Sequence, residues 1–355
     1  MHFKSHLARW LTPLLLTGLC LSALAHGTQS HAAETGLLRS TAPDRATRLL
    51  AAAKAEGSLT LYTSIAEKDI APLIEPFQKK YGIKVNVWRA SGDSVLARIV
   101  NETRAKRYTA DALHIGSVEL EALSREKLLQ AVASPHFAEL MPGTVPAHKE
   151  WASTVLSLWT QAYNTQSVKA AELPKTYADL LDPRWKGRLG YEVENVDWFV
   201  TVVKSMGEAQ GLQFFRDLAS RNGISVRKGH SNLTNMVAAG EVPMALTVYN
   251  YMPEQFKKRG APIDSLVLQP AVARANGIAV LRHATHPNAA ALFMDYLLGE
   301  AQPAFASLDY LPTNTKVDSP WRSIKMNIVD PVESLDHREK WRKLYDEIIM
   351  RGGRP

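Results

Sequence analysis

The fold of this chain is decided by three repeats of one pattern, found in LTLYTS (residues 59–64), IKVNVWRASGDS (residues 83–94) and ADALHIGS (residues 110–117). Each repeat is an apolar run typical of a buried strand, followed by a serine-containing loop and a segment with the apolar spacing of a helix. Strands that alternate with helices predict an α/β fold with an open, parallel sheet. Ligands of such sheets bind beyond the carboxyl ends of the strands, where helix amino termini offer free N–H groups. The repeats therefore predict a binding cleft.

The amino terminus has the features of a secretory signal peptide. A basic start and a mostly apolar run over residues 11–24 end in Ala23-Leu24-Ala25, which predicts export and cleavage after Ala25, with a second candidate site after Ala33. An uncleaved anchor is the alternative. Cys20 is the only cysteine of the chain, so the mature protein has none. A cysteine-free exported protein of this size indicates a bacterial periplasmic protein that depends on a hydrophobic core.

The length of 355 residues favours two domains. Residues 151–164 read as one strand long enough to pass from one domain into another, and residues 266–281 return as extended chain around Gly277. A chain that leaves a first domain, builds a second and comes back predicts two lobes joined by a two-strand hinge. The predicted parts are a signal peptide (1–25), lobe one (36–155 and 268–312) and lobe two (156–267 and 313–355).

Composition and motifs exclude several classes of function. The formal net charge of +7 is spread along the chain without a basic stripe or interleaved aromatics, which argues against nucleic-acid binding. The sequence has no Gly-x-Ser-x-Gly, Walker loop, His-Glu-x-x-His or dinucleotide glycine motif. The pairs His283/His286 and His136/Glu139 have no third ligand nearby in sequence. We therefore expect a protein that is not an enzyme and carries no cofactor or resident metal.

Several segments, in order over roughly 270 residues, resemble the ferric-iron type of periplasmic solute-binding protein of ABC importers. This extracellular solute-binding family has the type II fold of two lobes, a hinge and a central cleft. The matching segments are 61–64 (LYTS), 77–85 (FQKKYGIKV), 91–94 (SGDS), 163–165 (YNT), 182–188 (DPRWKGR), 238–243 (AAGEVP) and 286–290 (HPNAA).

The resemblance implies capture of a small solute in the cleft by hinge closure, and delivery to an inner-membrane ABC permease. From the hydroxyl groups of lobe one and the acidic residues of lobe two described below, we expect a small polar solute that is zwitterionic, amine-bearing or anionic. We also expect a monomer that acts in the periplasm. The alternative from another class is a periplasmic receptor that presents the same cleft to a signalling partner.

The sequence departs from the iron-binding members of that family at the positions of the metal ligands. Those members carry adjacent tyrosines after the Gly-Glu-Val strand, whereas this chain reads Val248-Tyr249-Asn250-Tyr251. By alignment, Ala66 and Gly116 stand where those members bring a histidine and a glutamate. Ferric iron prefers several anionic oxygens. We therefore expect an organic solute, and a ferric iron-binding protein remains the alternative.

The three loops of lobe one offer hydroxyl and backbone N–H donors to a ligand at helix starts. Ordinary helix N-capping explains any one of these serines equally well. The Asp93 carboxylate opposes an anion unless it caps its own helix. The predicted contacts of lobe one are Tyr62, Thr63, Ser64, Ser91, Gly92, Asp93 and Ser117.

Acidic side chains gather in lobe two, where Glu192, Glu194 and Asp197 fall within six residues. Glu194, Asp197 and the neighbouring Trp198 suggest an acidic wall with an aromatic plate, suited to an ammonium group. The alternative is favourable charge at a helix start, with Asp197 as the N-cap and Trp198 in the core.

Two tyrosines complete the predicted contacts of lobe two. Tyr249 and Tyr251 are expected to share one face of a strand and to line the cleft. Nearby, Arg227, Lys228 and His230 precede Ser231 and could supply charge to an acidic ligand. We expect this segment to be a solvated loop instead.

Overall fold

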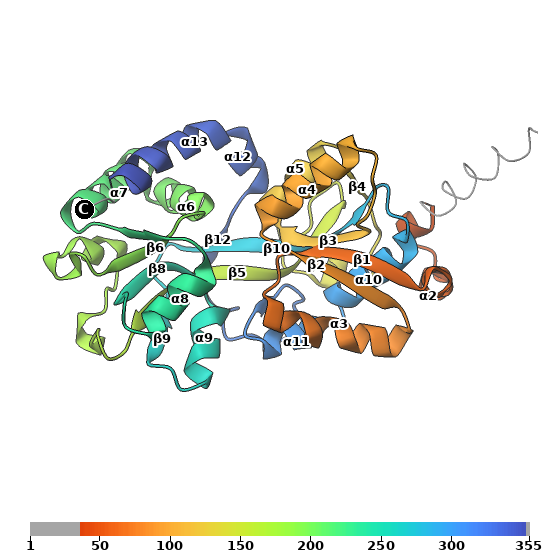
Figure 1. Cartoon of the computed structure of the whole chain (residues 1–355), viewed down its shortest axis with the longest axis horizontal. Coiled ribbons are helices and arrows are strands. Elements are labelled where there is room, and N and C mark those ends of the chain that lie inside the picture. The colour runs from red at the N-terminus through yellow and green to blue at the C-terminus, as the bar shows by residue number, and fades with distance from the viewer. Residues whose placement is uncertain (1–35, 353–355) are drawn as a thin grey trace, which may run out of the picture.

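The computed structural model describes residues 36–352. The predicted signal peptide, its cleavage sites and Cys20 lie outside the described residues. Figure 1 shows two lobes side by side, with strands β5, β10 and β12 running between them. No helix among the described residues is long and apolar enough to cross a membrane.

Lobe one contains the three strand–loop–helix repeats predicted from the sequence. Strands β2, β1 and β3 lie side by side and run parallel, so the predicted parallel sheet is confirmed here. Helices α3, α4 and α5 follow these strands in turn. The elements of this lobe are α2 (Arg45–Glu56), β1 (Ser58–Thr63), α3 (Glu67–Tyr81), β2 (Lys84–Arg89), α4 (Gly92–Arg104), β3 (Ala112–Gly116), α5 (Ser117–Arg125), β4 (Leu129–Gln130), α10 (Pro287–Leu298), α11 (Gln302–Ser307) and β11 (Leu311–Pro312).

Two long strands, β5 (Trp151–Asn164) and β10 (Ala271–Leu281), cross between the lobes. They pair with each other in antiparallel register, and β10 is also antiparallel to β3. The sheet is therefore mixed at these strands, because β10 carries the chain back toward lobe one. The register shifts between Asn276 and Gly277. A Cβ at Gly277 would lie 2.5 Å from the carbonyl oxygen of Ala152, so the close approach of the two strands requires glycine.

Lobe two is a smaller sheet, in which β8, β6 and β7 follow β5 in the strand order and β9 also pairs with β5. The C-terminal segment returns to this lobe after β12, which pairs with β10. The elements are β6 (Leu189–Glu192), α6 (Val196–Met206), α7 (Glu208–Arg221), β7 (Ser225–Arg227), α8 (His230–Ala238), β8 (Met244–Tyr249), α9 (Tyr251–Lys258), β9 (Ile263–Leu266), β12 (Met326–Ile328), α12 (Pro331–Asp336) and α13 (Arg338–Tyr345). Short turns of 3₁₀ or π helix cover 137–139, 170–172, 177–181, 183–185 and 346–351.

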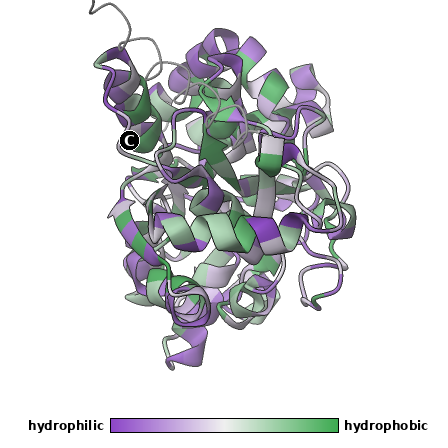
Figure 2. Cartoon of the chain, turned by 90° about the vertical axis from the view of Figure 1, so that its right-hand side faces the viewer, coloured by the Kyte–Doolittle hydropathy of each residue, from purple (hydrophilic) through white to green (hydrophobic). Residues whose placement is uncertain are grey.

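Each lobe has its own large core of buried apolar side chains. In lobe one, Phe77 contacts Phe293 edge-on, with ring centroids 5.0 Å apart. In lobe two, Trp198 packs against Phe215, with ring centroids 5.7 Å apart. Figure 2 views the molecule from the lobe-one end and shows hydrophobic and hydrophilic residues alternating along the outer helices, as expected for helices that bury one face.

Helix α12 lies between the two lobes and is tied to both of them. Asp336 pairs with Arg125 of α5 in lobe one at 2.7 Å, and Glu333 pairs with Lys204 of α6 in lobe two at 2.8 Å. Figure 1 shows α12 above the strands that join the lobes, between α5 and α6. The C-terminal segment therefore covers one side of the space between the lobes.

Candidate functional site

A cleft of about 760 Å³ lies between the lobes. Its wall is formed by the loops after β1, β2 and β3, by the crossing strands, by the loops after β6 and β8, and by the C-terminal helices. The charged residues in its lining are Arg89, Asp93, Glu119, Glu192, Glu194, Asp197, Arg274, Arg338 and Arg342.

The floor of the cleft is polar and is built on strand β10. Arg274 pairs in register with Ser157 of β5, and Asn276 pairs with Gly116 of β3. Asn276 donates a hydrogen bond from Nδ2 to the Ser157 hydroxyl at 2.8 Å. All four residues line the cleft, so the strands that join the lobes also supply its floor.

Arg274 forms an ion pair with Glu119 of α5 through Nη2. Burial alone would raise the pKa of Glu119, but the Arg274 guanidinium outweighs it and holds that pKa below its usual value. A Cβ at Gly116 would overlap the Arg274 guanidinium and would lie 2.6 Å from Glu119 Oε2. Gly116 thus makes room for the ion pair at the position where iron-binding relatives were expected to bring a glutamate.

His114 of β3 also lines the floor and is 2% exposed. Its Nε2 lies 2.6 Å from the Thr154 hydroxyl, whereas Nδ1 is buried without a hydrogen-bond partner among the described residues. Burial lowers the pKa of His114 to about 4, so the imidazole is neutral at pH 7.

The acidic side of the cleft belongs to lobe two. Burial raises the pKa of Glu192, Glu194 and Asp197 above their usual values. The Arg274 guanidinium partly opposes that rise at Asp197. Neither Glu194 nor Asp197 forms an ion pair with another described residue within 4.0 Å. These two carboxylates therefore line the cleft without a direct ion pair, although Arg274 and Arg338 act on Asp197 at longer range.

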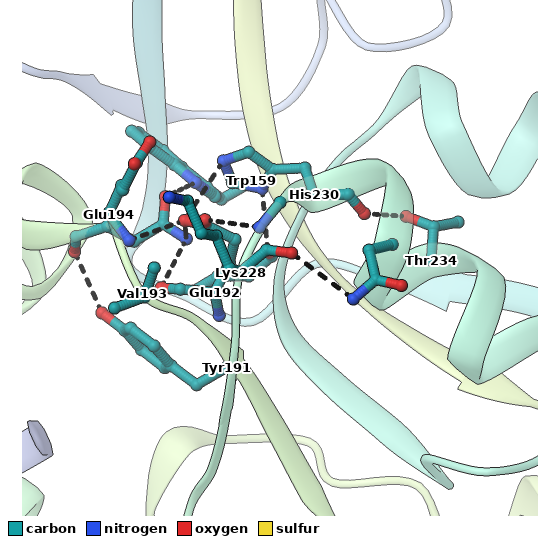
Figure 3. A network of polar contacts seen from close by, with 12 residues as sticks. Trp159, Tyr191, Glu192, Val193, Glu194, Lys228, His230 and Thr234 are labelled. Carbon is teal, nitrogen blue, oxygen red and sulfur yellow. Dashed lines mark hydrogen bonds and ion pairs between the residues drawn. The ribbon is translucent and has the colours of Figure 1, made fainter. Parts of the chain in front are cut away.

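Glu192 differs from its neighbours because the protein itself satisfies its carboxylate. Its Oε1 accepts from the backbone N–H of Gly229 at 3.0 Å, and its Oε2 accepts from the N–H of Glu194 at 2.8 Å. Asn195 Nδ2 donates to the same Oε2 at 3.1 Å. Figure 3 shows this network, with Glu194 and His230 beside Glu192. Glu192 thus holds the loop that presents Glu194.

The prediction of a solvated loop at residues 227–231 is wrong for His230. Its ring lies 4.2 Å from the ring of Tyr249 between centroids, and its Nδ1 lies 3.2 Å from the carbonyl oxygen of Thr247. Burial lowers the pKa of His230 to about 4. His230 opens helix α8 and lines the cleft, because the loop folds back onto the end of β8.

Tyr249 and Tyr251 both line the cleft, but not as residues of one strand. Strand β8 ends at Tyr249, Asn250 has helical backbone angles (φ −46°, ψ −43°), and Tyr251 begins α9. The prediction of a shared strand face is therefore wrong. The two rings are nevertheless inclined by only 14°, with centroids 6.1 Å apart. Burial raises the pKa of both hydroxyls, so both are neutral phenols at pH 7.

The three predicted serines have different surroundings. Ser91 is the N-cap of α4, and its Oγ accepts from the N–H of Ser94 at 3.3 Å. Ser64 lines the cleft but caps no helix, because α3 begins after Ala66. Ser117 is fully buried as the first residue of α5 and does not line the cleft.

Three further predicted contact residues also lie outside the cleft lining, together with Ser117. Tyr62 is 1% exposed and donates to Glu102 Oε1 at 2.9 Å, on the side of the sheet covered by α4. Thr63 is buried and donates to the carbonyl oxygen of His114 at 3.1 Å. Trp198 is a core residue and not an aromatic plate, because the first turn of α6 points it into lobe two.

The remaining predicted residues all contribute to the lining. They are Ser64, Ser91, Gly92, Asp93, Glu194, Asp197, Tyr249 and Tyr251. Sequence reasoning missed Glu119, Arg274, His114 and Tyr310. A signal for Arg274 was present, since it is the only charged residue in the apolar strand AVARANGIAVL (271–281).

Among the described residues, no group of three or more histidine, cysteine or acidic side chains is placed to hold a metal ion. Tyrosine hydroxyls are the remaining side-chain oxygens that could bind iron at the cleft. Tyr251 stacks on Tyr310 at 4.1 Å between centroids, and Tyr310 donates its hydroxyl to Asp69 Oδ2 at 2.8 Å. The cleft floor thus combines phenols with a fixed guanidinium, which repels a cation.

Comparison with known families identifies the chain's relatives. The sequence model of one family, described as bacterial extracellular solute-binding protein, matches residues 119–327, more than half of the chain. The chain belongs to this family. Similar proteins include the Fe(3+)-binding periplasmic protein of Serratia marcescens, 29% identical over 57% of this chain and 60% of the relative. The major ferric iron-binding protein of Neisseria gonorrhoeae is 27% identical over 60% of this chain and 65% of the relative. The chain therefore matches about three fifths of the length of these curated relatives.

Solved structures show the same two-lobe fold of this solute-binding family. Iron-bound HitA from Pseudomonas aeruginosa is similar with a TM-score of 0.71 and 23% identity, covering 81% of this chain and 99% of the other. AfuA from Actinobacillus pleuropneumoniae, solved with fructose-6-phosphate, has a TM-score of 0.73 and 22% identity, covering 83% and 99%. At this identity the similarity establishes the periplasmic-binding-protein fold, and these neighbours hold chemically different ligands.

Proposed function

We propose that this solute-binding protein is the periplasmic substrate-binding component of an ABC importer. It captures a small polar organic solute in the cleft, the lobes close around it, and the closed form is recognised by an inner-membrane permease. The observation that carries this proposal is the cleft of about 760 Å³, to which both lobes and both crossing strands contribute polar groups. A ligand that touches both lobes stabilises the closed form over the open one.

The proposed lobes are residues 36–155 with 268–312, and residues 156–267 with 313–355. Moving an equilibrium from mostly open to mostly closed requires about 5.5 kcal/mol of differential affinity. A few charged hydrogen bonds that form only on closure, at about 1.5–3 kcal/mol each, reach that figure. The proposal includes no catalytic activity, a view supported by relatives that are solute-binding proteins. It also takes the protein to act as a monomer.

A thermal-shift screen of the purified protein tests this proposal. The panel contains amino acids, amines, phosphonates, carboxylates, sugar phosphates and ferric citrate. A ligand at 100 times its Kd stabilises the folded protein by about 2.7 kcal/mol, which raises Tm by several degrees. We expect at least one organic compound to do so with 1:1 stoichiometry. Absence of any shift across the panel contradicts the proposal.

Ferric iron is a second candidate solute, because the curated relatives are named as iron-binding proteins and Tyr249, Tyr251 and Tyr310 lie together beside the cleft. The fixed Arg274 and the replacement of the expected glutamate by Gly116 argue against it. Visible absorbance after addition of ferric citrate separates the two candidates, since tyrosinate bound to iron is coloured.

Export through the predicted signal peptide belongs to the same proposal. The relatives named above include a periplasmic protein. We expect the intact mass of protein recovered from the periplasm to correspond to cleavage after Ala25, or after Ala33. Recovery of periplasmic protein that retains Met1 contradicts this part of the proposal.

A further inference from the structure

We infer that the solute is zwitterionic, with its anionic group bound by Arg274 on the cleft floor and its amine bound by Glu194 or Asp197 of lobe two. This inference rests on the proposed function and names the solute class. It is carried by the charges and the unsatisfied polar atoms of the cleft.

Arg274 has donors that the protein does not use. A guanidinium carries five N–H donors, and among the described residues only Glu119 accepts from it, through Nη2. The Nε atom is buried without a partner. Buried polar atoms are nearly always paired in folded proteins, so an unpaired one needs an explanation. The Nε–Nη2 edge faces Gly116 and Glu119. Nη1 also has no acceptor among the described residues, and a carboxylate or phosphonate on the solute supplies one there.

The position of Arg274 is fixed before a solute binds. Its side chain is 17% exposed, Glu119 holds one edge of the guanidinium, and the absent Cβ of Gly116 leaves space for it. His114 provides a second unsatisfied atom on the same floor, the buried Nδ1. Fixed donors and acceptors of this kind favour specific binding.

Lobe two contributes negative charge to the cleft without a direct ion pair. Glu194 and Asp197 form no ion pair within 4.0 Å with another described residue, and the Arg274 and Arg338 guanidiniums act on Asp197 only at longer range. An ammonium group of the solute gains an ion pair beside either carboxylate. The Tyr249 ring at the same wall offers a cation–π contact.

The charge balance of the whole lining fits a solute with both signs. The lining contains five carboxylates and four guanidiniums, so a solute with both signs of charge finds a group of opposite charge for each of its ends. The acidic residues are Asp93, Glu119, Glu192, Glu194 and Asp197, and the basic residues are Arg89, Arg274, Arg338 and Arg342.

A matched series of compounds tests the inference on the full protein. The two-ended probes are glycine, β-alanine, 4-aminobutanoate, 6-aminohexanoate and 2-aminoethylphosphonate. Each is compared with its separate halves, for example n-propylamine and butanoate for 4-aminobutanoate, or ethylamine and ethylphosphonate for 2-aminoethylphosphonate. We expect at least one two-ended probe to raise Tm more than both of its halves at equal concentration. If none does, the inference is overturned. The carboxylate and phosphonate arms distinguish the two kinds of anionic group.

Substitutions at Arg274 and its neighbours test whether this residue binds the anionic group of the solute. With the best two-ended probe, Arg274→Gln is expected to raise Kd at least tenfold, whereas the Kd of the matched amine is expected not to rise, because the removed charge acts on Asp197. Because Arg274→Gln leaves Glu119 buried without its partner, the double variant Arg274→Gln/Glu119→Gln is measured as well. Gly116→Ala keeps every charge but displaces the guanidinium, so it is expected to weaken the two-ended probe in the same way.

Arg45→Gln is the matched control. Arg45 pairs with Asp295 at 2.7 Å, with side chains 7% and 13% exposed, and neither residue lines the cleft. This variant breaks a buried ion pair of the same kind and is expected to lower Tm without changing Kd. The inference is overturned if Arg274→Gln weakens binding of the two-ended probe and of its amine half equally. It is also overturned if the affinity for the two-ended probe is unchanged in both Arg274→Gln and Arg274→Gln/Glu119→Gln. Binding of a sugar phosphate or ferric citrate without any zwitterion overturns it and leaves the proposed transport function standing.

Discussion

Tyr251 of lobe two stacks on Tyr310 of lobe one, with ring centroids 4.1 Å apart and ring planes inclined by 27°. Asn250 extends the contact, since its Nδ2 donates to the carbonyl oxygen of Asp309 at 3.0 Å. The start of α9 is therefore packed against the segment that follows α11, beside the crossing strands. Tyr251 consequently belongs to the apolar core of lobe one although its helix belongs to lobe two.

This contact predicts a difference between two substitutions at Tyr251. Tyr251→Ala removes a ring that is 7% exposed and is expected to lower the free energy of unfolding by about 3–5 kcal/mol. Tyr251→Phe keeps the stack and is expected to cost less than about 1.5 kcal/mol. Urea unfolding measures both values. Equal stability of the two variants would mean that the stack does not join the lobes.

The iron alternative is tested by colour. Tyr249 and Tyr251 are neutral phenols whose pKa values are raised by burial, and Arg274 repels a cation from the same floor. We expect no charge-transfer band in the visible spectrum when ferric citrate is added at one equivalent. A stoichiometric coloured complex that disappears in Tyr251→Phe would show that iron is the solute.

Ser91 and Ser64 form a matched pair for separating helix capping from ligand contact. Ser91→Ala removes the N-cap of α4 and is expected to lower the free energy of unfolding by about 1 kcal/mol. Ser64 caps no helix, so Ser64→Ala is expected to leave stability within about 0.5 kcal/mol. If the Ser64 hydroxyl meets a charged group of the solute, its loss weakens binding by about 1–3 kcal/mol. Titration calorimetry and urea unfolding on both variants give the two quantities, and a loss of stability in Ser64→Ala would contradict this division.

Removing the charge of Glu194 or Asp197 is expected to change the Kd of amines and the Kd of anions in opposite directions. Asp197→Asn and Glu194→Gln keep the shape of each side chain and remove its charge. The Kd of n-propylamine is therefore expected to rise in both variants, and the Kd of butanoate to fall. Direct titration at low salt measures the four values. Unchanged affinity for both compounds would assign these carboxylates to the surface and remove the amine site.

His114 predicts a pH dependence of stability. Its folded pKa of about 4 lies below the unfolded value near 6.5. As pH falls below about 6.5 the unfolded chain binds a proton that the folded protein refuses, so stability falls until about pH 4, by up to about 3 kcal/mol. Between pH 7 and pH 4.5, the free energy of unfolding is therefore expected to fall by about 1–3 kcal/mol less in His114→Gln than in the wild type.

Urea unfolding at the two pH values measures this difference. The raised pKa values of Glu192 and Glu194 make stability rise as pH falls. This effect is common to wild type and His114→Gln, so it cancels when the two proteins are compared. Identical losses in wild type and His114→Gln would contradict a buried, neutral imidazole at this position.

Local patterns were sufficient to predict most elements of the fold. The alternating runs after Leu59 predicted β1, β2 and β3, and the long run from Trp151 to Asn164 predicted β5 with the bounds that the structure has. These elements follow from periodicity and burial, which are properties of neighbouring residues. The direction of β10 was not predictable from its own sequence, because strand pairing depends on where the chain returns.

The site was predicted less completely, because it depends on which way side chains point. Ser64 and Tyr62 are two residues apart, yet one lines the cleft and the other is buried under α4. Trp198 follows Asp197 directly, but the helical turn sends their side chains to different surroundings. Arg274 and Glu119 are 155 residues apart, and only the folded chain brings them together. Pairing over such a distance leaves no local pattern in one sequence.

The binding mode of a zwitterion is decided by a crystal structure of the complex with the tightest-binding two-ended compound. We expect one solute in the cleft between the lobes, with its anionic group in hydrogen-bond contact with Arg274 and its amine in contact with Glu194 or Asp197. A solute bound outside the cleft, or inside it with its amine against Arg274, would show that this binding mode is wrong.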